Sequence, residues 1–493
     1  MPAAEAREAV CEDGPMAGPL ERPDLPEVQR PEPRRPSGGR ARLDLTPLRT
    51  SRDLRLLFAG GGISFAGSML TFVAIPYQAY QLTHSSLVVG LLSLAEMVAL
   101  LLTGLVGGAL ADAFDRRRLL RVTEAGMLAG SAALIVNAAL GHPQLWVLFA
   151  VSFLLAALDG VQTPALGSLV PRLVPADQLP ATSALMSVRV QFGMIAAPAL
   201  SGVLISVAGL RTAYEIDAAT YAISLGALWF LGEAPPPAEG SEVSVRAVVD
   251  GLRYAFSRKD LLGSYLVDIN AMFFGFPNAL YPQLAARLGG PSVLGFLYAA
   301  PAVGSAVVTI TSGWTARVRR RGRMIATGAV VWGLGIVALG FASAAWAAAL
   351  ALAVAGGGDA LSGLGRTTMW NESIPDALRG RLAGVELLSY SSGPTLGNVE
   401  SGLVESLAGL RTAIVSGGIL CVVGSALLSL ALPAFWGYDA AKGQRLREAG
   451  APGAGDEAGG SGARAGAGGP GGGGSGEGGA TRAPDAGRSP GEA

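Results

Sequence analysis

The sequence contains few of the residues that build disulfides, metal sites or charged surfaces. Its 493 residues include two cysteines and two histidines, and only 15% of the residues are charged. Cys11 falls in a polar tail and Cys421 in an apolar run, so a disulfide framework or a cysteine-based metal site is not expected. His84 and His142 fall in short polar breaks, which excludes a histidine-rich site. We expect no metal and no cofactor.

Long apolar runs dominate the rest of the chain. Half of the residues are hydrophobic, and a helix of roughly 20 apolar residues crosses the core of a bilayer. No nucleophile constellation or nucleotide-binding loop occurs, so an enzyme is not expected and transport would draw on an ion gradient or diffusion. The pattern predicts an all-α polytopic membrane protein with twelve transmembrane helices at 58–82, 86–110, 118–140, 144–168, 181–207, 211–232, 261–286, 291–316, 322–342, 346–369, 382–407 and 409–432.

The placement of arginine and lysine predicts the orientation. With the N-terminus in the cytoplasm, 32 of the 37 basic residues fall on the cytoplasmic side. Arg211, Arg287 and Arg411 fall outside, and two lie within spans. No apolar stretch precedes residue 50, so no cleavable signal peptide is expected. We predict a multi-pass cell-membrane protein, in a bacterial inner membrane, with both termini cytoplasmic.

The two ends and the middle of the chain differ from the spans. Residues 1–50 and 437–493 are rich in Pro, Gly, Ala and charge, a composition typical of disordered tails. Within the central loop 233–260, apolar residues recur every three or four positions. This spacing predicts an amphipathic helix at the cytoplasmic surface, with an ordinary linker helix as the alternative.

An internal repeat divides the spans into two sets of six. The segment 208–213, Ala-Gly-Leu-Arg-Thr-Ala, recurs at 408–413. The same offset of 200 pairs Asp159 with Asp359 and Pro175 with Pro375. Because these matches share one register, we predict two six-helix repeats, at 51–232 and 261–436.

The loop after the second span identifies the family. It contains Gly108 and Asp112, followed by four consecutive charged residues, Asp115, Arg116, Arg117 and Arg118. This resembles the signature loop of the major facilitator superfamily, although Ala113 replaces its usual first arginine. The resemblance implies the major facilitator fold, with Asp112 as a gate that pairs with Arg379 or Arg381 of the eleventh span. The alternative for the arginines alone is positive-inside topology.

Further stretches are similar to one branch of that superfamily. Val-Ala-Ile-Pro-Tyr-Gln at 73–78, Leu-Asp-Gly at 158–160 and Leu-Tyr-Pro-Gln-Leu at 280–284 resemble the enterobactin exporter and its relatives. Macrolide and multidrug exporters are close to this branch. The resemblance implies proton-coupled efflux of a siderophore or similar secondary metabolite by alternating access. The alternatives are a drug or macrolide exporter, a nutrient importer, or a non-transporting membrane receptor.

Charged residues within spans are the candidates for proton coupling. Asp159 and Arg189 fall at similar depth on adjacent spans, so we expect them to pair. Such a pair either couples transport to protons or is a static structural contact. The analogous candidates in the second half are Asp359, Arg366 and Glu386.

A substrate site is expected near the midplane, between the halves. Amide, acidic and aromatic residues there suit a bulky amphiphile. The candidates for the substrate path are Gln78, Glu96, Asp268, Asn270, Phe274, Asn278, Tyr390 and Asn398. The expected partners are a small-molecule substrate, the lipid bilayer and protons, without nucleic acid, and we expect a monomer.

Overall fold

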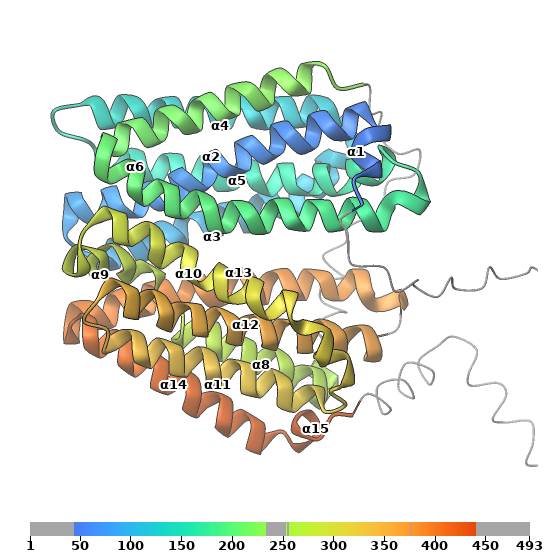
Figure 1. Ribbon diagram of the computed structural model, residues 1–493, viewed down its shortest axis with the longest axis vertical. Coiled ribbons are helices and arrows are strands. Elements are labelled where there is room, and N and C mark those ends of the chain that lie inside the picture. Colours follow the sequence, from blue (N-terminus) through green and yellow to red (C-terminus); the bar gives the residue numbers. More distant parts are fainter. Residues whose placement is uncertain (1–43, 233–252, 254–255, 375, 440–493) are drawn as a thin grey trace, which may run out of the picture. The chain divides into compact units, whose positions relative to one another are not determined.

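The computed structural model describes residues 44–232, 253, 256–374 and 376–439 (Figure 1). All regular structure in these ranges is helical, in agreement with the predicted all-α membrane protein. Nine helices of the described ranges are long and apolar enough to cross a membrane, whereas the count of twelve crossings stays a prediction. The expectations for residues 1–43, most of 233–260 and 440–493 fall outside the described residues.

Helices of the first half follow the predicted spans closely. Two of them begin at a serine cap: the Ser51 side chain accepts a hydrogen bond from the backbone N–H of Leu54 (3.1 Å), and the Ser85 side chain accepts one from Val88 (3.5 Å). The elements are α1 (Thr46–Thr50), α2 (Arg52–Thr83), α3 (Ser86–Ala113), α4 (Arg116–Ala139), α5 (Leu145–Leu169) and α6 (Leu179–Trp229), with short 3₁₀ turns at Val170–Arg172 and Ala176–Gln178. We call α2–α6 the N-terminal bundle.

The second half repeats this order of helices with one interruption. Its elements are α8 (Lys259–Phe274), α9 (Tyr281–Leu288), α10 (Pro291–Ile310), α11 (Arg321–Gly340), α12 (Ala345–Ser373), α13 (Asp376–Ala408), α14 (Leu410–Ala431) and α15 (Pro433–Trp436), with 3₁₀ turns at Asn278–Leu280 and Ser312–Arg317. We call α8–α14 the C-terminal bundle.

The predicted seventh span, 261–286, is not one continuous helix. Helix α8 ends at Phe274, and α9 begins at Tyr281. Pro277 lacks a backbone N–H, and the residue before a proline disfavours helical backbone, which explains the break. The backbone carbonyl of Gly275 accepts a hydrogen bond from Trp332 Nε1 (2.8 Å), so α11 holds the break in place.

Two glycines of the predicted repeat have the same backbone conformation. Gly209 has φ 85° and ψ 170°, and Gly409 has φ 85° and ψ 163°. This region of φ favours glycine because a Cβ atom would clash there. Gly209 interrupts α6 between the predicted fifth and sixth spans, and Gly409 separates α13 from α14. The matching turns support the predicted duplication.

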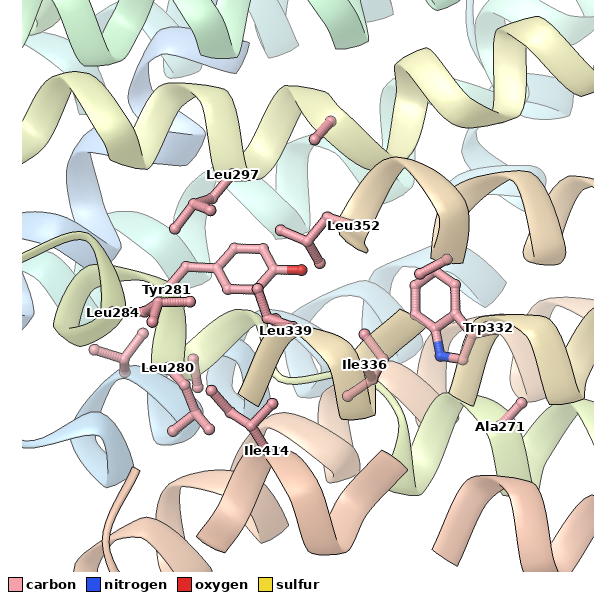
Figure 2. Close-up of a cluster of buried hydrophobic side chains, with 14 of the residues drawn as sticks. Ala271, Leu280, Tyr281, Leu284, Leu297, Trp332, Ile336, Leu339, Leu352 and Ile414 are labelled. Carbon is pink, nitrogen blue, oxygen red and sulfur yellow. The ribbon is translucent and has the colours of Figure 1, made fainter. Parts of the chain in front are cut away.

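A dense apolar core fills the C-terminal bundle (Figure 2). Tyr281, Leu297 and Trp332 lie within it, each at most 4% exposed. Gly304 and Gly356 bring α10 and α12 so close that a Cβ at either position would collide with the backbone of the other helix. The C-terminal bundle is therefore held by packed side chains and by direct backbone contact.

The two bundles meet through α6 against α10 and α3 against α13. A Cβ at Gly90 would lie 2.5 Å from the carbonyl oxygen of Asn398, and one at Gly202 would lie 2.6 Å from the backbone nitrogen of Gly295. Asn398 Nδ2 also donates a hydrogen bond to Ser93 Oγ (3.2 Å). Gly90 and Gly295 lie near the starts of their helices, whereas Asn398 and Gly202 lie near the predicted ends of their spans, so these contacts gather at one end of the bundles.

Candidate functional site: an acidic cavity in the N-terminal bundle

The N-terminal bundle contains a cavity of about 550 Å³. The described residues that line it all belong to α2–α6. Three carboxylates, Glu96, Glu124 and Asp159, share its wall with one guanidinium, that of Arg189. The predicted site between the halves therefore differs from this cavity, which lies within one half.

Glu124 of α4 is the most completely fixed of these carboxylates. Its side chain is buried, with the residue only 2% exposed. Its Oε1 accepts hydrogen bonds from Ser64 Oγ of α2 (3.2 Å), Gln162 Nε2 of α5 (3.1 Å) and Ser224 Oγ of α6 (3.0 Å). Its Oε2 has no hydrogen-bond partner among the described residues. Oε1 therefore links α4 to three other helices, whereas Oε2 remains able to accept a hydrogen bond.

Asp159 and Arg189 line the same cavity but do not pair. The described residues contain no ion pair between them, and Asp159 Oδ1 accepts a hydrogen bond from Thr163 Oγ1 of its own helix (3.4 Å). The Arg189 side chain lies against α2, where a Cβ at Gly61 would be 2.7 Å from Nη1. The expected contact is thus absent from this conformation, in which the Arg189 side chain lies along α2.

Glu96 is the one predicted substrate-path residue that lines this cavity. It extends from α3 and shares the wall with Ser152 of α5. The aromatic and apolar part of the wall comes mainly from α2, with Phe65, Met69 and Phe72. The cavity therefore combines acidic groups with an apolar face, a composition suited to an amphiphilic ligand.

Among the predicted coupling residues of the second half, Arg366 has a different partner from the one expected. Arg366 of α12 forms an ion pair with Asp268 of α8, which had been predicted to lie on the substrate path. Asp359 has no hydrogen bond or ion pair with any described residue. The side chain of Glu386 lies outside the described residues. Arg366 therefore balances the charge of Asp268 on the neighbouring helix α8.

Three other predicted substrate-path residues form hydrogen bonds within the protein. Gln78 Oε1 accepts a hydrogen bond from the Tyr214 hydroxyl (2.8 Å). Asn270 Nδ2 donates to the carbonyl of Cys421 (3.0 Å), which ties α8 to α14. Asn398 Oδ1 accepts from the backbone N–H of Ala279 (3.0 Å).

Three further candidates complete that set. The Asn278 carbonyl accepts a hydrogen bond from the Tyr298 hydroxyl (3.5 Å). The Phe274 ring meets the neighbouring Phe273 ring edge-on, with centroids 4.8 Å apart. The side chain of Tyr390 lies outside the described residues. Neither Asn278 nor Phe274 lines the acidic cavity.

The predicted gate loop connects α3 to α4. Asp115 caps α4 by accepting a hydrogen bond from the backbone N–H of Arg117 (2.8 Å). Arg117 Nη2 donates to the carbonyl of Trp229 at the end of α6 (2.9 Å), a favourable place for a cation because helix C-termini carry partial negative charge. Arg116 is buried and Arg118 exposed.

The gate contact itself stays a prediction. Gly108 lies within α3, whereas the side chains of Asp112, Arg379 and Arg381 lie outside the described residues.

Two buried carboxylates are not among the residues predicted from the sequence. Glu124 falls in the predicted third span and Asp217 in the predicted sixth. Asp217 Oδ2 accepts hydrogen bonds from Thr71 Oγ1 (2.6 Å) and Ser131 Oγ (2.7 Å), and the residue is fully buried. A carboxylate within a span is itself the signal, because its exposure to lipid is costly and it must find partners inside the bundle.

Comparison with known proteins agrees with this fold. A family model described as a transmembrane secretion effector matches residues 43–450. Enterobactin exporter EntS of Citrobacter koseri is 29% identical over 395 residues, which cover 79% of this chain and 94% of that protein. Enterobactin exporter EntS of Shigella flexneri is 29% identical over 388 residues, which cover 78% of this chain and 93% of that protein.

Solved structures share the same architecture at low identity. A bacterial homologue of the human lysosomal transporter Spinster, inward-facing and unoccupied, aligns with a TM-score of 0.62 and 15% identity over 78% of this chain and 96% of its own. A bacterial homologue of the iron transporter ferroportin, in an inward-facing state, aligns with a TM-score of 0.60 and 16% identity over 77% and 98%. Because the family model spans most of the sequence, the chain belongs to the transmembrane secretion effector family of major facilitator transporters.

Proposed function

We propose that this chain exports a siderophore or similar secondary metabolite across the cytoplasmic membrane in exchange for protons. Two relatives at 29% identity are named enterobactin exporters, which supports export of a small molecule. The acidic cavity is the observation that carries the proposal, because an exchanger for protons needs carboxylates that bind a proton or a substrate in turn.

The contacts between the bundles support alternating access as the transport mechanism. They gather at the ends near Gly90 and Gly202, on the side that the arginine distribution assigns to the exterior. In this proposal both termini are cytoplasmic, and the structure is an inward-facing state in which the cavity communicates with the cytoplasm. Asp112 closes that side by pairing with Arg379 or Arg381 once the substrate has bound, before the opposite side opens.

Asp159 is the proposed coupling residue. It lines the cavity without an ion-pair partner, so its carboxylate is accessible to a proton or a ligand. When a proton or a cationic ligand leaves Asp159, Arg189 on the same wall can move toward this carboxylate and balance its negative charge. Asp359 and Glu386 are the corresponding candidates of the second half.

A drug or macrolide exporter of the same mechanism is the second candidate. The apolar wall of Phe65, Met69 and Phe72 favours it, since these side chains accept varied amphiphiles. Catalysis forms no part of either proposal.

Transport into inside-out membrane vesicles tests the proposal. Vesicles that contain the full chain receive a proton gradient, and uptake of a labelled catecholate siderophore and of a macrolide is followed. We expect gradient-driven uptake of one compound, and at least about a tenfold loss of that uptake in Asp159→Asn.

Two controls make the result specific. Glu215→Gln removes a carboxylate from an exposed position of α6 and should transport normally. Dissipating the gradient should abolish uptake in the wild type. Absence of gradient-driven uptake for both compounds would contradict the proposed substrates, and full uptake by Asp159→Asn would remove Asp159 from the coupling step.

A further inference from the structure

We infer that the cavity contains a subsite for an organic cation, built on Glu124, and that the exported substrate carries an ammonium group on an apolar body. This inference rests on the proposed export function and narrows its substrate class to amine-bearing compounds, which favours the drug or macrolide candidate over a catecholate siderophore without an ammonium group. It assigns substrate recognition to Glu124 of α4, a residue distinct from the proposed coupling residue Asp159.

The geometry of Glu124 is that of a prepared binding group. Hydrogen bonds from Ser64, Gln162 and Ser224 all end on Oε1, so the carboxylate is held from three helices at once. Oε2 has no partner among the described residues although the side chain is buried on the cavity wall. An ammonium that donates to Oε2 would form a charge-assisted hydrogen bond, which is roughly twice as strong as a neutral one.

The balance of acidic and basic groups in the cavity also favours a cationic ligand. Glu96, Glu124 and Asp159 contribute three acidic groups, against the single guanidinium of Arg189. None of the three forms an ion pair with a described residue, and buried charge without a partner is costly. A cation can therefore replace a proton at this wall, which is the exchange that the proposed function requires.

The apolar face supplies the rest of the recognition. Phe65 lies against Gly193, where a Cβ would come within 2.6 Å of its ring, so the ring is fixed in place. Aromatic rings also attract cations through the negative potential of their faces. The combination of Phe65, Met69 and Phe72 with Glu124 therefore suits an amine attached to a hydrophobic or aromatic body.

Three probes of one shape test this subsite directly. Naphthylethylamine, naphthylethanol and naphthylacetate share an aromatic body and are respectively cationic, neutral and anionic at neutral pH. Their equilibrium binding to the purified full chain in detergent is measured without any gradient. We expect the amine to bind at least about tenfold more tightly than the alcohol and the acetate. Equal binding of amine and alcohol, or preference for the acetate at Arg189, would overturn the inference.

A neutral variant then locates the subsite. Glu124→Gln keeps an oxygen acceptor for the three donors and should weaken amine binding about tenfold while leaving alcohol binding unchanged. Glu215→Gln, on the outside of α6, should change neither. Equal weakening of amine and alcohol would show a structural role for Glu124 and would also overturn the inference. The three-probe comparison in the wild type shows whether the cavity prefers a cationic ligand, even if Glu124→Gln does not fold.

Competition with protons provides a readout that a structural role would not change. The charged and titratable groups around Glu124 are Glu96 on α3, Asp159 on α5, and Arg189, Asp217 and Tyr221 on α6. Amine affinity in the wild type should fall as the pH is lowered, and Glu124→Gln should flatten that dependence. An unchanged dependence in the variant would assign the competition to another group and contradict the role of Glu124.

Vesicle transport separates this inference from the proposed function. Gradient-driven uptake without preference for amine-bearing compounds would leave export intact and reject the cation subsite. Selective amine binding without any gradient-driven uptake would keep the subsite and reject proton-coupled export.

Discussion

The two bundles differ in how their carboxylates are partnered. In the C-terminal bundle, two carboxylates form ion pairs, Asp268 with Arg366 and Glu372 with Arg321 at 3.2 Å, whereas Asp359 has no partner among the described residues. In the described part of the N-terminal bundle, Glu124 and Asp159 face a cavity and form no ion pair. Most of the paired charge therefore lies in one half, and the carboxylates that line the cavity lie in the other.

The two bundles also differ in how densely their side chains are packed. The largest apolar cluster is concentrated in α8–α14, where Trp332 and Leu297 are buried (Figure 2). The cavity of about 550 Å³ lies within α2–α6. The C-terminal bundle is therefore the more densely packed half and the N-terminal bundle the hollow one, which is the half that carries proton exchange in the proposed function.

The largest effect is expected from breaking a charge pair of the C-terminal bundle. Arg366→Ala leaves Asp268 buried without its cation, and we expect a loss of roughly 3–5 kcal/mol in the free energy of unfolding. Arg189→Ala is the matched variant in the other bundle, and because Arg189 forms no ion pair with a described residue, its loss should stay below about 1 kcal/mol. Denaturant titration of both purified variants in detergent measures the difference.

The double variant Asp268→Leu with Arg366→Met serves as the control. Replacing a buried pair by apolar residues is often neutral, so it should recover most of the lost stability. Equal destabilisation by Arg366→Ala and Arg189→Ala would show that the two bundles do not differ in this respect.

Shortening an apolar side chain gives the next largest effect. Leu297→Ala leaves a void in the packed core, and we expect a loss of roughly 2–5 kcal/mol. Met69→Ala only enlarges an existing cavity, so its loss should be below about 1 kcal/mol. Thermal unfolding of the two variants checks the order, and a larger loss for Met69→Ala would refute the proposed division between a densely packed and a hollow bundle.

A third prediction concerns the end of the C-terminal bundle at which α8 begins, and the dependence of its stability on pH. Burial alone would raise the pKa of Asp260, but hydrogen bonds and charge from Arg258, 2.6 Å away, lower it overall. A carboxylate with a lowered pKa stabilises the fold above its unfolded value of about 3.9, and this contribution is lost as the pH falls through its folded pKa.

The corresponding variant is Asp260→Asn. It should lower stability by roughly 1.5–3 kcal/mol between pH 5 and 7, the range typical of hydrogen bonds to charged groups. The difference from the wild type should shrink below about pH 4. A difference that persists unchanged in acid would mean that the asparagine disrupts packing and that the Arg258 contact contributes little.

Much of the fold could be predicted from the sequence because apolar length and glycine position are local signals. The runs of about 20 apolar residues correspond to most of the helices, and the repeated segments at 208–213 and 408–413 place matching turns at Gly209 and Gly409. Gly275 and Pro277 inside the predicted seventh span are the local signal for the break, which apolar length alone does not reveal.

The site was harder to predict because it depends on how helices face one another. Sequence places Asp159 and Arg189 at similar depth, yet rotation of α6 turns Arg189 along Gly61 of α2. The pairing of Arg366 with Asp268 joins α12 to α8, helices far apart in the chain. The periodicity of one helix does not give its rotation against another. Glu124 was identifiable from its charge alone, but its three donors come from three other helices.

The smallest effects are expected at a pair of equivalent arginines that follow the two glycine turns. Arg211 Nε donates to Glu215 Oε1 (2.7 Å) in an exposed pair, whereas Arg411 lies over the ring of Phe341, 4.5 Å from its centre. Arg211→Ala should lower stability by about 0.3–0.5 kcal/mol, and Arg411→Ala by about 0.5–1 kcal/mol. Thermal unfolding in low and high salt distinguishes them. Salt should remove most of the first effect, because exposed ion pairs are screened, and less of the second, which also depends on contact with the ring. The arginine after the turn is thus held by an ion pair in the N-terminal bundle and by contact with an aromatic ring in the C-terminal bundle. Identical salt responses of the two variants would show that the two bundles are stabilised alike at this point.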